Sequence, residues 1–271
     1  MDHWENPIAH SIDINTPSIA RMYDWYLGGT DNFPSDRKAC RDLLEIAPST
    51  CALARNNRLF LQRVVRVLAL EYGVRQFIDF GCGLPTGNNV HQVAQSIDRS
   101  SRVVYADSDP IVLAHGRTLL DENDETCFVR ADLTDADRIF DRPEVAGLID
   151  RKAPVAALFV SGLHRIPDSH EPGCIVRRVT EKLASGSFVV ICQLVSDSAA
   201  TRQAATEFMR QTTDDNWGRV REKSEVQAYF DGLELLTPGL VEVSAWRPDS
   251  DVAPRQRTFE WEEYGGVARL P

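Results

Sequence analysis

A short apolar strand that breaks into a glycine turn constrains the fold of this chain more than any other feature. Residues 76–83 have the sequence QFIDFGCG, and a second apolar segment at 102–106 ends on Asp107, 28 residues after Asp79. Glycines allow a sharp turn and a close approach of a ligand to the backbone, because they carry no Cβ atom. An acid that closes the next strand can accept hydrogen bonds from two ribose hydroxyls. The two segments therefore predict a nucleoside-binding crevice at the carboxyl ends of parallel strands.

Strands and helices are expected to alternate from Gln76 onward. The apolar segments predict strands at 76–80, 102–107, 126–131, 155–161 and 187–195, and two late strands within 240–246 and 265–270. Helices are expected near 88–97, 110–121, 134–149, 171–184, 199–212 and 224–231. The central strands are apolar on both faces, which is typical of a parallel sheet covered by helices. We therefore expect an α/β fold with a doubly wound, Rossmann-like, mostly parallel sheet of seven strands.

The residues before the first strand are expected to be helical. Helical spacing of apolar residues predicts helices near 17–27, 36–46 and 51–72. Thr16 and Pro17 favour the start of the first helix, and Gly28 favours its end. No long or low-complexity linker follows, so we expect residues 1–75 to form a helical cap within the same unit as the domain at 76–271.

The charge balance of the chain argues against a nucleic-acid partner. Lys and Arg number 30 against 40 Asp and Glu, which gives a net charge of −10. Nucleic-acid binding depends on the neutralisation of phosphates by basic side chains.

No apolar run approaches the ~18 residues of a membrane span, and the N-terminal acids are unlike a signal peptide. The six cysteines are scattered and include no C-x-x-C pair, so no metal site is predicted and a cytoplasmic location is expected.

The glycine turn favours S-adenosylmethionine over NAD as the nucleoside ligand. The NAD fingerprint needs a further glycine at position 86, where this chain has Thr86. Asp107 also lies further along than the ~20 residues usual for the ribose-binding acid of NAD proteins. Asp79 would repel a pyrophosphate, whereas it suits a ligand that carries an ammonium and a sulfonium group. A nicotinamide oxidoreductase is therefore the weaker alternative.

Several motifs resemble those of class I S-adenosylmethionine-dependent methyltransferases. These are the D-x-G-x-G pattern at 79–83, Asp107 before the helix-opening Pro110, and the sequence ADL at 131–133. Residues 17–33, 83–91 and 104–115 further resemble an actinobacterial S-adenosyl methyltransferase family that was once called a domain of unknown function. The resemblance extends from about Pro17 to Arg269. It departs from the methyltransferase pattern at Pro85, where a third glycine is common.

The resemblance implies one group of residues for the methionine end of the cofactor. Asp79, Gly81 and Gly83 would hold the methionine, with backbone contacts at the two glycines. Ser161, at the end of the fourth expected strand, would face the sulfonium and the methyl acceptor.

A second group is implied for the adenosine end. Asp107 would accept hydrogen bonds from both ribose hydroxyls, and Ser108 would lie beside the adenine. Asp132 and the backbone of Leu133 would bind the adenine amino group. The alternative for Asp132 is that it caps the helix that follows it.

The first helix and the loop after it suggest a lid. Tyr23 and Tyr26 lie at helical spacing, and the loop GGTDNF at 28–33 contains Asn32 and Phe33. Glycine-rich loops with amide and aromatic side chains are typical of lids over ligands. The hypothesis is that these four residues close over the cofactor, and the alternative is that the tyrosines are ordinary core residues.

Methyl transfer is a direct displacement, so positioning of the acceptor does most of the work. A general base is needed only when the acceptor carries a proton that must leave. His164, just past the fourth expected strand, is the candidate base, and its alternative role is to cap a turn. The sequence thus predicts an enzyme that methylates a small molecule, and the alternative function is a non-catalytic module that senses S-adenosylmethionine.

Overall fold

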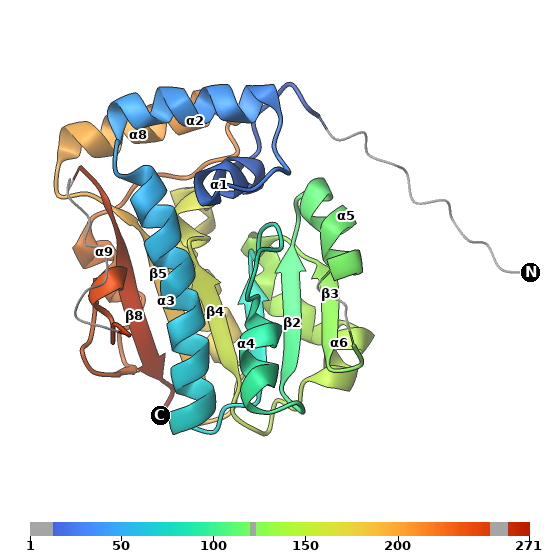
Figure 1. Cartoon of the computed structure of the whole chain (residues 1–271). Helices are drawn as coiled ribbons and strands as arrows, with labels where there is room; N and C mark the ends of the chain where they lie inside the picture. Colours follow the sequence, from blue (N-terminus) through green and yellow to red (C-terminus); the bar gives the residue numbers. More distant parts are fainter. Residues whose placement is uncertain (1–12, 120–122, 250–259) are drawn as a thin grey trace, which may run out of the picture.

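A sheet of eight strands runs through the part of the chain that the computed structural model describes, residues 13–119, 123–249 and 260–271. The strands are β1 (Gln76–Phe80), β2 (Arg102–Asp107), β3 (Thr126–Arg130), β4 (Ala156–Val160), β5 (Phe188–Val195), β6 (Glu234–Leu235), β7 (Val241–Glu242) and β8 (Glu262–Arg269). Their order is β3-β2-β1-β4-β5-β8-β6, and β7 also pairs with β8. The first five strands are parallel and β8 is antiparallel to β5, so the carboxyl ends of β1 to β5 meet at one edge (Figure 1).

The predicted α/β class, the mostly parallel sheet and the five central strands are confirmed. The described residues hold eight strands where the sequence predicted seven, because the two-residue β6 was not expected. The segment 240–246 is also not one strand: it forms β7 and then the 3₁₀ helix η4 (Val243–Ala245). Both short strands depend on pairing with β8 and carry too few residues for a visible alternation of apolar side chains.

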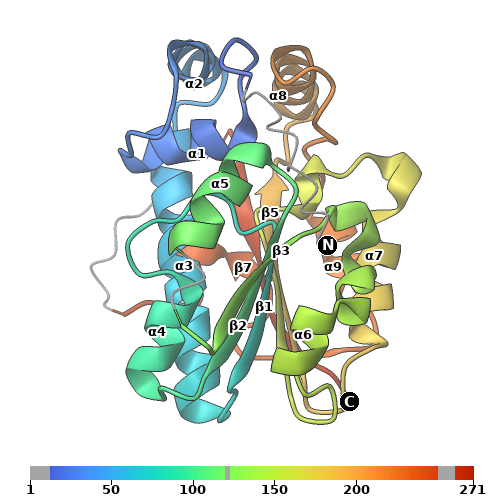
Figure 2. The same ribbon diagram turned by 90° about the vertical axis from the view of Figure 1, so that its right-hand side faces the viewer.

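Helices cover both faces of the sheet, as Figure 2 shows. On one face lie α3 (Thr50–Glu71), α4 (Val90–Ile97) and α5 (Pro110–Leu119); on the other lie α6 (Pro143–Leu148), α7 (Pro172–Thr180) and α9 (Lys223–Ala228). The expected helix at 134–149 is wrong, because this segment consists of the 3₁₀ helix η1 (Leu133–Asp141) followed by α6. Pro143 lacks a backbone N–H and favours the first turn of a new helix, which explains the break.

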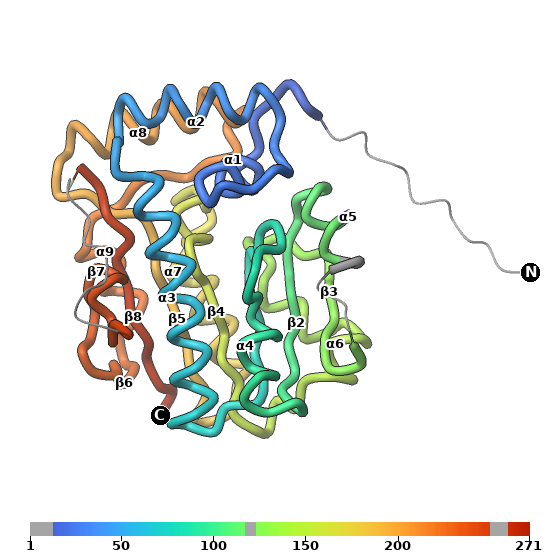
Figure 3. Tube along the Cα trace, viewed as in Figure 1, coloured from blue at the N-terminus to red at the C-terminus, as the bar shows by residue number. Residues whose placement is uncertain are grey.

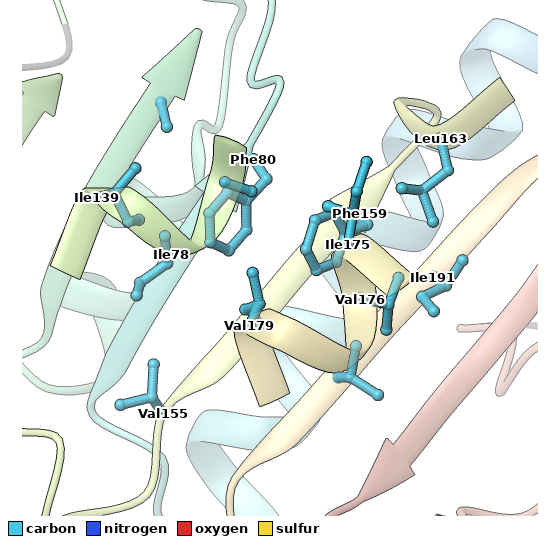
Figure 4. Close-up of a cluster of buried hydrophobic side chains, with 14 of the residues drawn as sticks. Ile78, Phe80, Ile139, Val155, Phe159, Leu163, Ile175, Val176, Val179 and Ile191 are labelled. Carbon is cyan, nitrogen blue, oxygen red and sulfur yellow. The ribbon is translucent and has the colours of Figure 1, made fainter. Parts of the chain in front are cut away.

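The core on the α6 and α7 side of the sheet is built from alternate strand residues. Ile78, Phe80, Phe159 and Ile191 are all buried there, in one cluster with side chains of α7 and η1 (Figure 4). The rings of Phe80 and Phe159 are stacked with their centroids 4.6 Å apart. Each such side chain contributes roughly 1.5–3 kcal/mol to folding by burial of apolar surface. The ends of β1 and β4, where the functional site lies, are therefore held on a rigid base.

Three helices cross the carboxyl edge of the strands and form a roof, which we define as α1 (Ile19–Leu27), α2 (Pro34–Ile46) and α8 (Ala199–Thr212). Figure 3 shows that α2 and α8, which are far apart in sequence, lie side by side, and the two are in contact. A buried ion pair of 2.8 Å between Arg21 and Asp36 joins α1 to α2. Helix α3 runs down from the roof onto the sheet, where Phe60 and Val64 are buried. No helix among the described residues is both long and apolar enough to span a bilayer.

Candidate functional site

A cavity lies between the roof and the carboxyl ends of the central strands. It comprises about 1010 Å³ of space, including the part open to solvent, and we call it the main cavity. Polar and glycine residues of its lining come from α1, α3, β1 with the glycine turn after it, the segment that follows β4, and β8. They include Tyr23, Asn57, Arg58, Asp79, Gly81, Gly83, Ser161, His164, Arg165 and Glu263. A smaller side pocket of about 530 Å³ is lined by Asp107, Ser108, Asp132 and Leu133. Gly81 and Arg165 line both, so an elongated ligand can pass from one to the other over the glycine turn.

The glycine turn adopts a conformation that other residues avoid. Gly81 has φ of 74° and Gly83 has φ of 68°, both in the left-handed region. The N–H of Gly81 donates to the carbonyl of Ala106 at 2.7 Å, which ties the turn to β2. A Cβ atom at Gly81 would lie 3.3 Å from Cδ1 of Leu133, whereas one at Gly83 would meet no protein atom within 4 Å. The turn therefore leaves open space above Gly83 for a ligand.

Asp107 is buried, and both its carboxylate oxygens are already engaged. Oδ2 accepts a hydrogen bond from the N–H of Gly83 at 3.0 Å, and Oδ1 accepts one from the N–H of Asp109 at 2.9 Å. Each carboxylate oxygen has two lone pairs, so each retains one for a ribose hydroxyl. Asp107 therefore lines the side pocket, and its carboxylate also shapes the glycine turn.

Ser108, Asp132 and Leu133 lie together in the side pocket with Asp107. Asp132 is exposed, and its Oδ1 accepts from both the backbone N–H and the hydroxyl of Thr134, at 2.8 Å each. The alternative capping role of Asp132 is thus present in the structure. It leaves the second carboxylate oxygen available at the rim of the pocket.

Asp79 is buried at the bottom of the main cavity, and burial raises its pKa to about 7. Arg58 of α3 lines the same cavity and acts in the opposite direction by favouring the carboxylate form of Asp79. Nη2 of Arg58 donates to Asn89 at 2.9 Å, while its Nε is buried without a hydrogen-bond partner in the described part of the chain. A buried carboxylate, together with a guanidinium N–H that has no partner among the described residues, fits an amino-acid head group, the end of S-adenosylmethionine that carries an ammonium and a carboxylate.

Ser161 and Glu263 meet in the lining of the main cavity. Ser161 has φ of 58°, an uncommon value for a residue other than glycine, and its hydroxyl donates to Oε1 of Glu263. Glu263 is 3% exposed, and burial raises its pKa to about 7. Strained backbone of this kind often occurs at functional sites. The sequence predicted Ser161 but gave no signal for Glu263, which is 102 residues away.

His164 lines the main cavity, but its hydrogen bonding does not favour the predicted role of a base. Nδ1 lies 3.3 Å from the backbone N–H of Leu194 and accepts from it, so the ring proton is on Nε2. Burial, together with the charges of Arg165 and Arg221, lowers the pKa of His164 to about 3. The ring also packs on Trp217 with the centroids 4.8 Å apart. These contacts are typical of a neutral histidine that holds two segments together.

The structure brings only two of the four predicted lid residues to the main cavity. Tyr23 and Tyr26 line it. Asn32 lies in the loop, where its amide donates to Asp24 at 2.7 Å and to the carbonyl of Gly29 at 3.0 Å. Phe33 packs beneath the guanidinium of Arg21, and neither Asn32 nor Phe33 is among the lining residues of either pocket. The conspicuous loop sequence therefore has a structural use of its own.

The remainder of the main cavity is apolar and aromatic. The side chains that form this part of its wall are Met22, Leu43, Leu53, Leu61, Leu194, Met209, Trp217 and Trp261. They come from the roof, α3, β5 and the segments that flank α8 and β8. Sequence reasoning did not find this wall, because its members become neighbours only in the folded chain.

Comparison with known proteins places the whole chain in one group. Residues 5–271 match the sequence profile of a family described as S-adenosyl methyltransferase. A DUF574 family protein from Streptomyces avermitilis is 37% identical, with a TM-score of 0.87 over 96% of this chain and 100% of that one. A protein from Thermobifida fusca YX, provisionally assigned as a methyltransferase, is 36% identical, with a TM-score of 0.89 over 99% of both chains. The search of curated proteins found no significant match.

Proposed function

The chain belongs to the S-adenosyl methyltransferase family, and on that premise we propose that it methylates a small molecule held in the apolar part of the main cavity. Family membership makes it a methyltransferase with S-adenosylmethionine as its cofactor. What the family does not give is the acceptor, the residues that bind each partner, and the division of the site between them.

The shape of the site is the observation that carries the proposal. The side pocket, with Asp107 and Ser108, is suited to adenosine, while Asp79 and Arg58 are suited to the amino-acid end of the cofactor. The main cavity then continues past Ser161 to the wall that contains Trp217 and Trp261. A module that only sensed the cofactor would need no such additional space, so this space favours catalysis over sensing.

The residues of the chain would contribute mainly by position and by exclusion of water. When bound, S-adenosylmethionine supplies an electrophilic methyl group on a sulfonium. The roof covers the site (Figure 1), and its helix α1 contributes Tyr23 to the lining of the cavity. Ser161 would lie between the cofactor and the acceptor. Burial of the reacting groups beneath apolar side chains limits competition from water. Alignment of the acceptor with the methyl group then provides most of the acceleration.

Calorimetry and a product assay together test this function. We expect S-adenosylmethionine and S-adenosylhomocysteine to bind and NAD not to bind. With a broad panel of small amines, phenols and carboxylic acids, we expect formation of S-adenosylhomocysteine to depend on one acceptor class. Binding without turnover across the whole panel would support the sensing alternative, and binding of NAD alone would contradict the proposal.

A further inference from the structure

Glu263 is a buried carboxylate that has no cationic partner among residues 13–119, 123–249 and 260–271. Its Oε1 accepts from Ser161, while its Oε2 is buried and has no hydrogen-bond partner within the described residues. No described lysine or arginine forms an ion pair with it. A buried, unpaired carboxylate is costly in free energy, and proteins rarely retain one without a use for it.

The groups around Glu263 do little to neutralise it. On β5, the Cys192 thiol lies beside the carboxylate, and on β7, Glu242 adds a second negative charge. From α1, Tyr23 interacts with it electrostatically as a neutral phenol, because burial raises the pKa of Tyr23. Burial is the main reason why the pKa of Glu263 rises to about 7, and the hydroxyl of Ser161 and the thiol of Cys192 act against that rise. A ligand that brought a positive charge would complete this site.

The rest of the main cavity indicates what such a ligand looks like. Besides Glu263, the wall of the main cavity includes the indoles of Trp217 and Trp261, which are both almost fully buried. Indole faces attract ammonium groups and also provide large apolar contact surfaces. The cavity therefore combines one acidic group with room for an apolar or aromatic body.

Resting on the proposed function, we propose that the acceptor is an amine with an apolar body, that Glu263 binds its ammonium group, and that Glu263 takes one proton from it before methylation. Asp79, which lies in β1 just before the glycine turn, would serve the amino-acid end of the cofactor. The two buried carboxylates thus divide the site, one for each cationic partner.

The step is balanced in protons and electrons. The ammonium form of the acceptor, R–NH₃⁺, gives one proton to the Glu263 carboxylate and becomes R–NH₂. The nitrogen lone pair forms the new N–CH₃ bond while the S–CH₃ bond breaks, and its electron pair remains on sulfur. The products are R–NH₂CH₃⁺, S-adenosylhomocysteine and protonated Glu263, which returns its proton to solvent when the product leaves.

Binding of matched probes to the protein saturated with S-adenosylhomocysteine tests the assignment. The probes are 2-phenylethylamine and 2-phenylethanol, which share an aromatic body and differ in the cationic group. We expect the amine to bind at least about tenfold more tightly than the alcohol, and Glu263→Gln to abolish that difference. Glu262→Gln is the matched control, because Glu262 is the neighbouring residue and pairs with Lys223 at 2.8 Å. It should retain the preference for the amine.

Ser161→Ala provides a second readout that does not remove the carboxylate. Since the hydrogen bond from Ser161 lowers the pKa of Glu263, its loss should move the pH midpoint of amine binding upward while the preference for the amine remains. Equal binding of amine and alcohol to the wild type, or an unchanged preference in Glu263→Gln, would overturn the proposal. The proposal would also fail if Glu263→Gln weakened the binding of S-adenosylmethionine more than that of S-adenosylhomocysteine, because Glu263 would then serve the sulfonium. Failure of the wild type to bind either cofactor form would instead contradict the proposed function.

Discussion

The carboxylate of Asp107 holds the glycine turn of the neighbouring strand, since its Oδ2 accepts a hydrogen bond of 3.0 Å from the backbone N–H of Gly83. The same carboxylate is the group expected to bind the ribose. One side chain thus shapes the turn and is expected to bind the ligand as well, so the two effects must be measured separately.

We expect Asp107→Ala to weaken the binding of S-adenosylhomocysteine by ~1.5–3 kcal/mol, because hydrogen bonds to a charged acceptor are lost. It should also lower the stability of the ligand-free protein by ~1–3 kcal/mol, because the N–H groups of Gly83 and Asp109 lose their acceptor. Calorimetry and denaturant unfolding measure the two effects. Asp109→Asn is the control, because it alters the hydrogen bond at the start of α5 and not the expected ribose site. Unchanged affinity in a folded Asp107→Ala variant would remove Asp107 from the binding site.

The two glycines of the turn should respond differently to substitution by alanine. Both have positive φ, so each variant should lose ~1–2 kcal/mol of stability from backbone strain. Gly81→Ala should lose more than Gly83→Ala, because its new Cβ would lie 3.3 Å from Leu133. Gly83→Ala should instead weaken the cofactor, since its Cβ points into open space that the ligand needs. Equal melting temperatures and equal affinities in the two variants would contradict this division.

The pH dependence of the ligand-free protein should reveal Asp79. Its folded pKa of about 7 lies above the ordinary value of 3.8, so the folded state binds the proton more tightly than the unfolded chain. Stability should therefore fall as pH rises between about 4 and 7. Asp79→Asn should remove part of this slope. The pKa of Glu263 is raised in the same way, so Glu263→Gln should remove another part.

Cofactor binding should have the opposite pH dependence to this stability. The ammonium of S-adenosylhomocysteine needs the ionised form of Asp79, so affinity should rise as pH increases toward 7 and then level off. Melting curves and calorimetry across this range measure both trends. A flat affinity profile in the wild type would argue against contact between Asp79 and the ammonium.

His164 should behave as a structural residue. His164→Phe should cost ~1–3 kcal/mol of stability, because it leaves the buried N–H of Leu194 without an acceptor. In the wild type, the contribution of neutral His164 to stability should be lost as pH falls from about 6.5 toward about 3. The pKa of His164 is lower in the folded state, so its protonation favours the unfolded chain. His164→Asn, which keeps an acceptor, should recover part of the stability. A limb near pH 6.5 in the activity profile of the wild type that disappeared in His164→Asn would restore the role of a base.

The sequence predicted which residues of the glycine turn and of the neighbouring strand lie close together, because their positions follow from local rules. The apolar strands that end in the glycine turn and in Asp107 lie in one parallel sheet, so their carboxyl ends had to meet. Arg58 and Glu263 could not be found in this way. Arg58 is one of several arginines on a helix, and Glu263 reaches Ser161 only through pairing of the antiparallel β8 with β5.

The loop at 28–33 shows why part of the lid hypothesis has no support from the lining of the cavity. A Cβ atom at Gly29 would lie 1.9 Å from Oδ1 of Asp24, so this glycine is required for packing. Asn32 holds the same aspartate, and Phe33 precedes the first residue of α2. A pattern typical of ligand-binding loops was thus produced by the connection between two helices.

The remaining lid hypothesis concerns Tyr23, whose hydroxyl donates to the carbonyl of Ala54 at 3.0 Å and accepts from Asn57 at 2.9 Å. If α1 closes over the cofactor, hydrogen exchange in residues 19–27 should slow when S-adenosylhomocysteine binds. Tyr23→Ala should then weaken the cofactor. As an ordinary core residue, Tyr23 would instead cost ~3–5 kcal/mol of stability on truncation, with affinity nearly unchanged. Exchange that does not respond to the ligand would exclude closure.

The roof and β8 have a consequence for how this architecture can diversify. The turn, Asp107 and the side pocket come almost entirely from the middle of the sequence, whereas the apolar wall comes from the segments on either side of it. Substitutions in those outer segments can change which molecules fit the main cavity and leave the nucleoside site intact. Two sequences with the same glycine turn can therefore serve different metabolites, and the flanking segments are where their differences in selectivity should be sought.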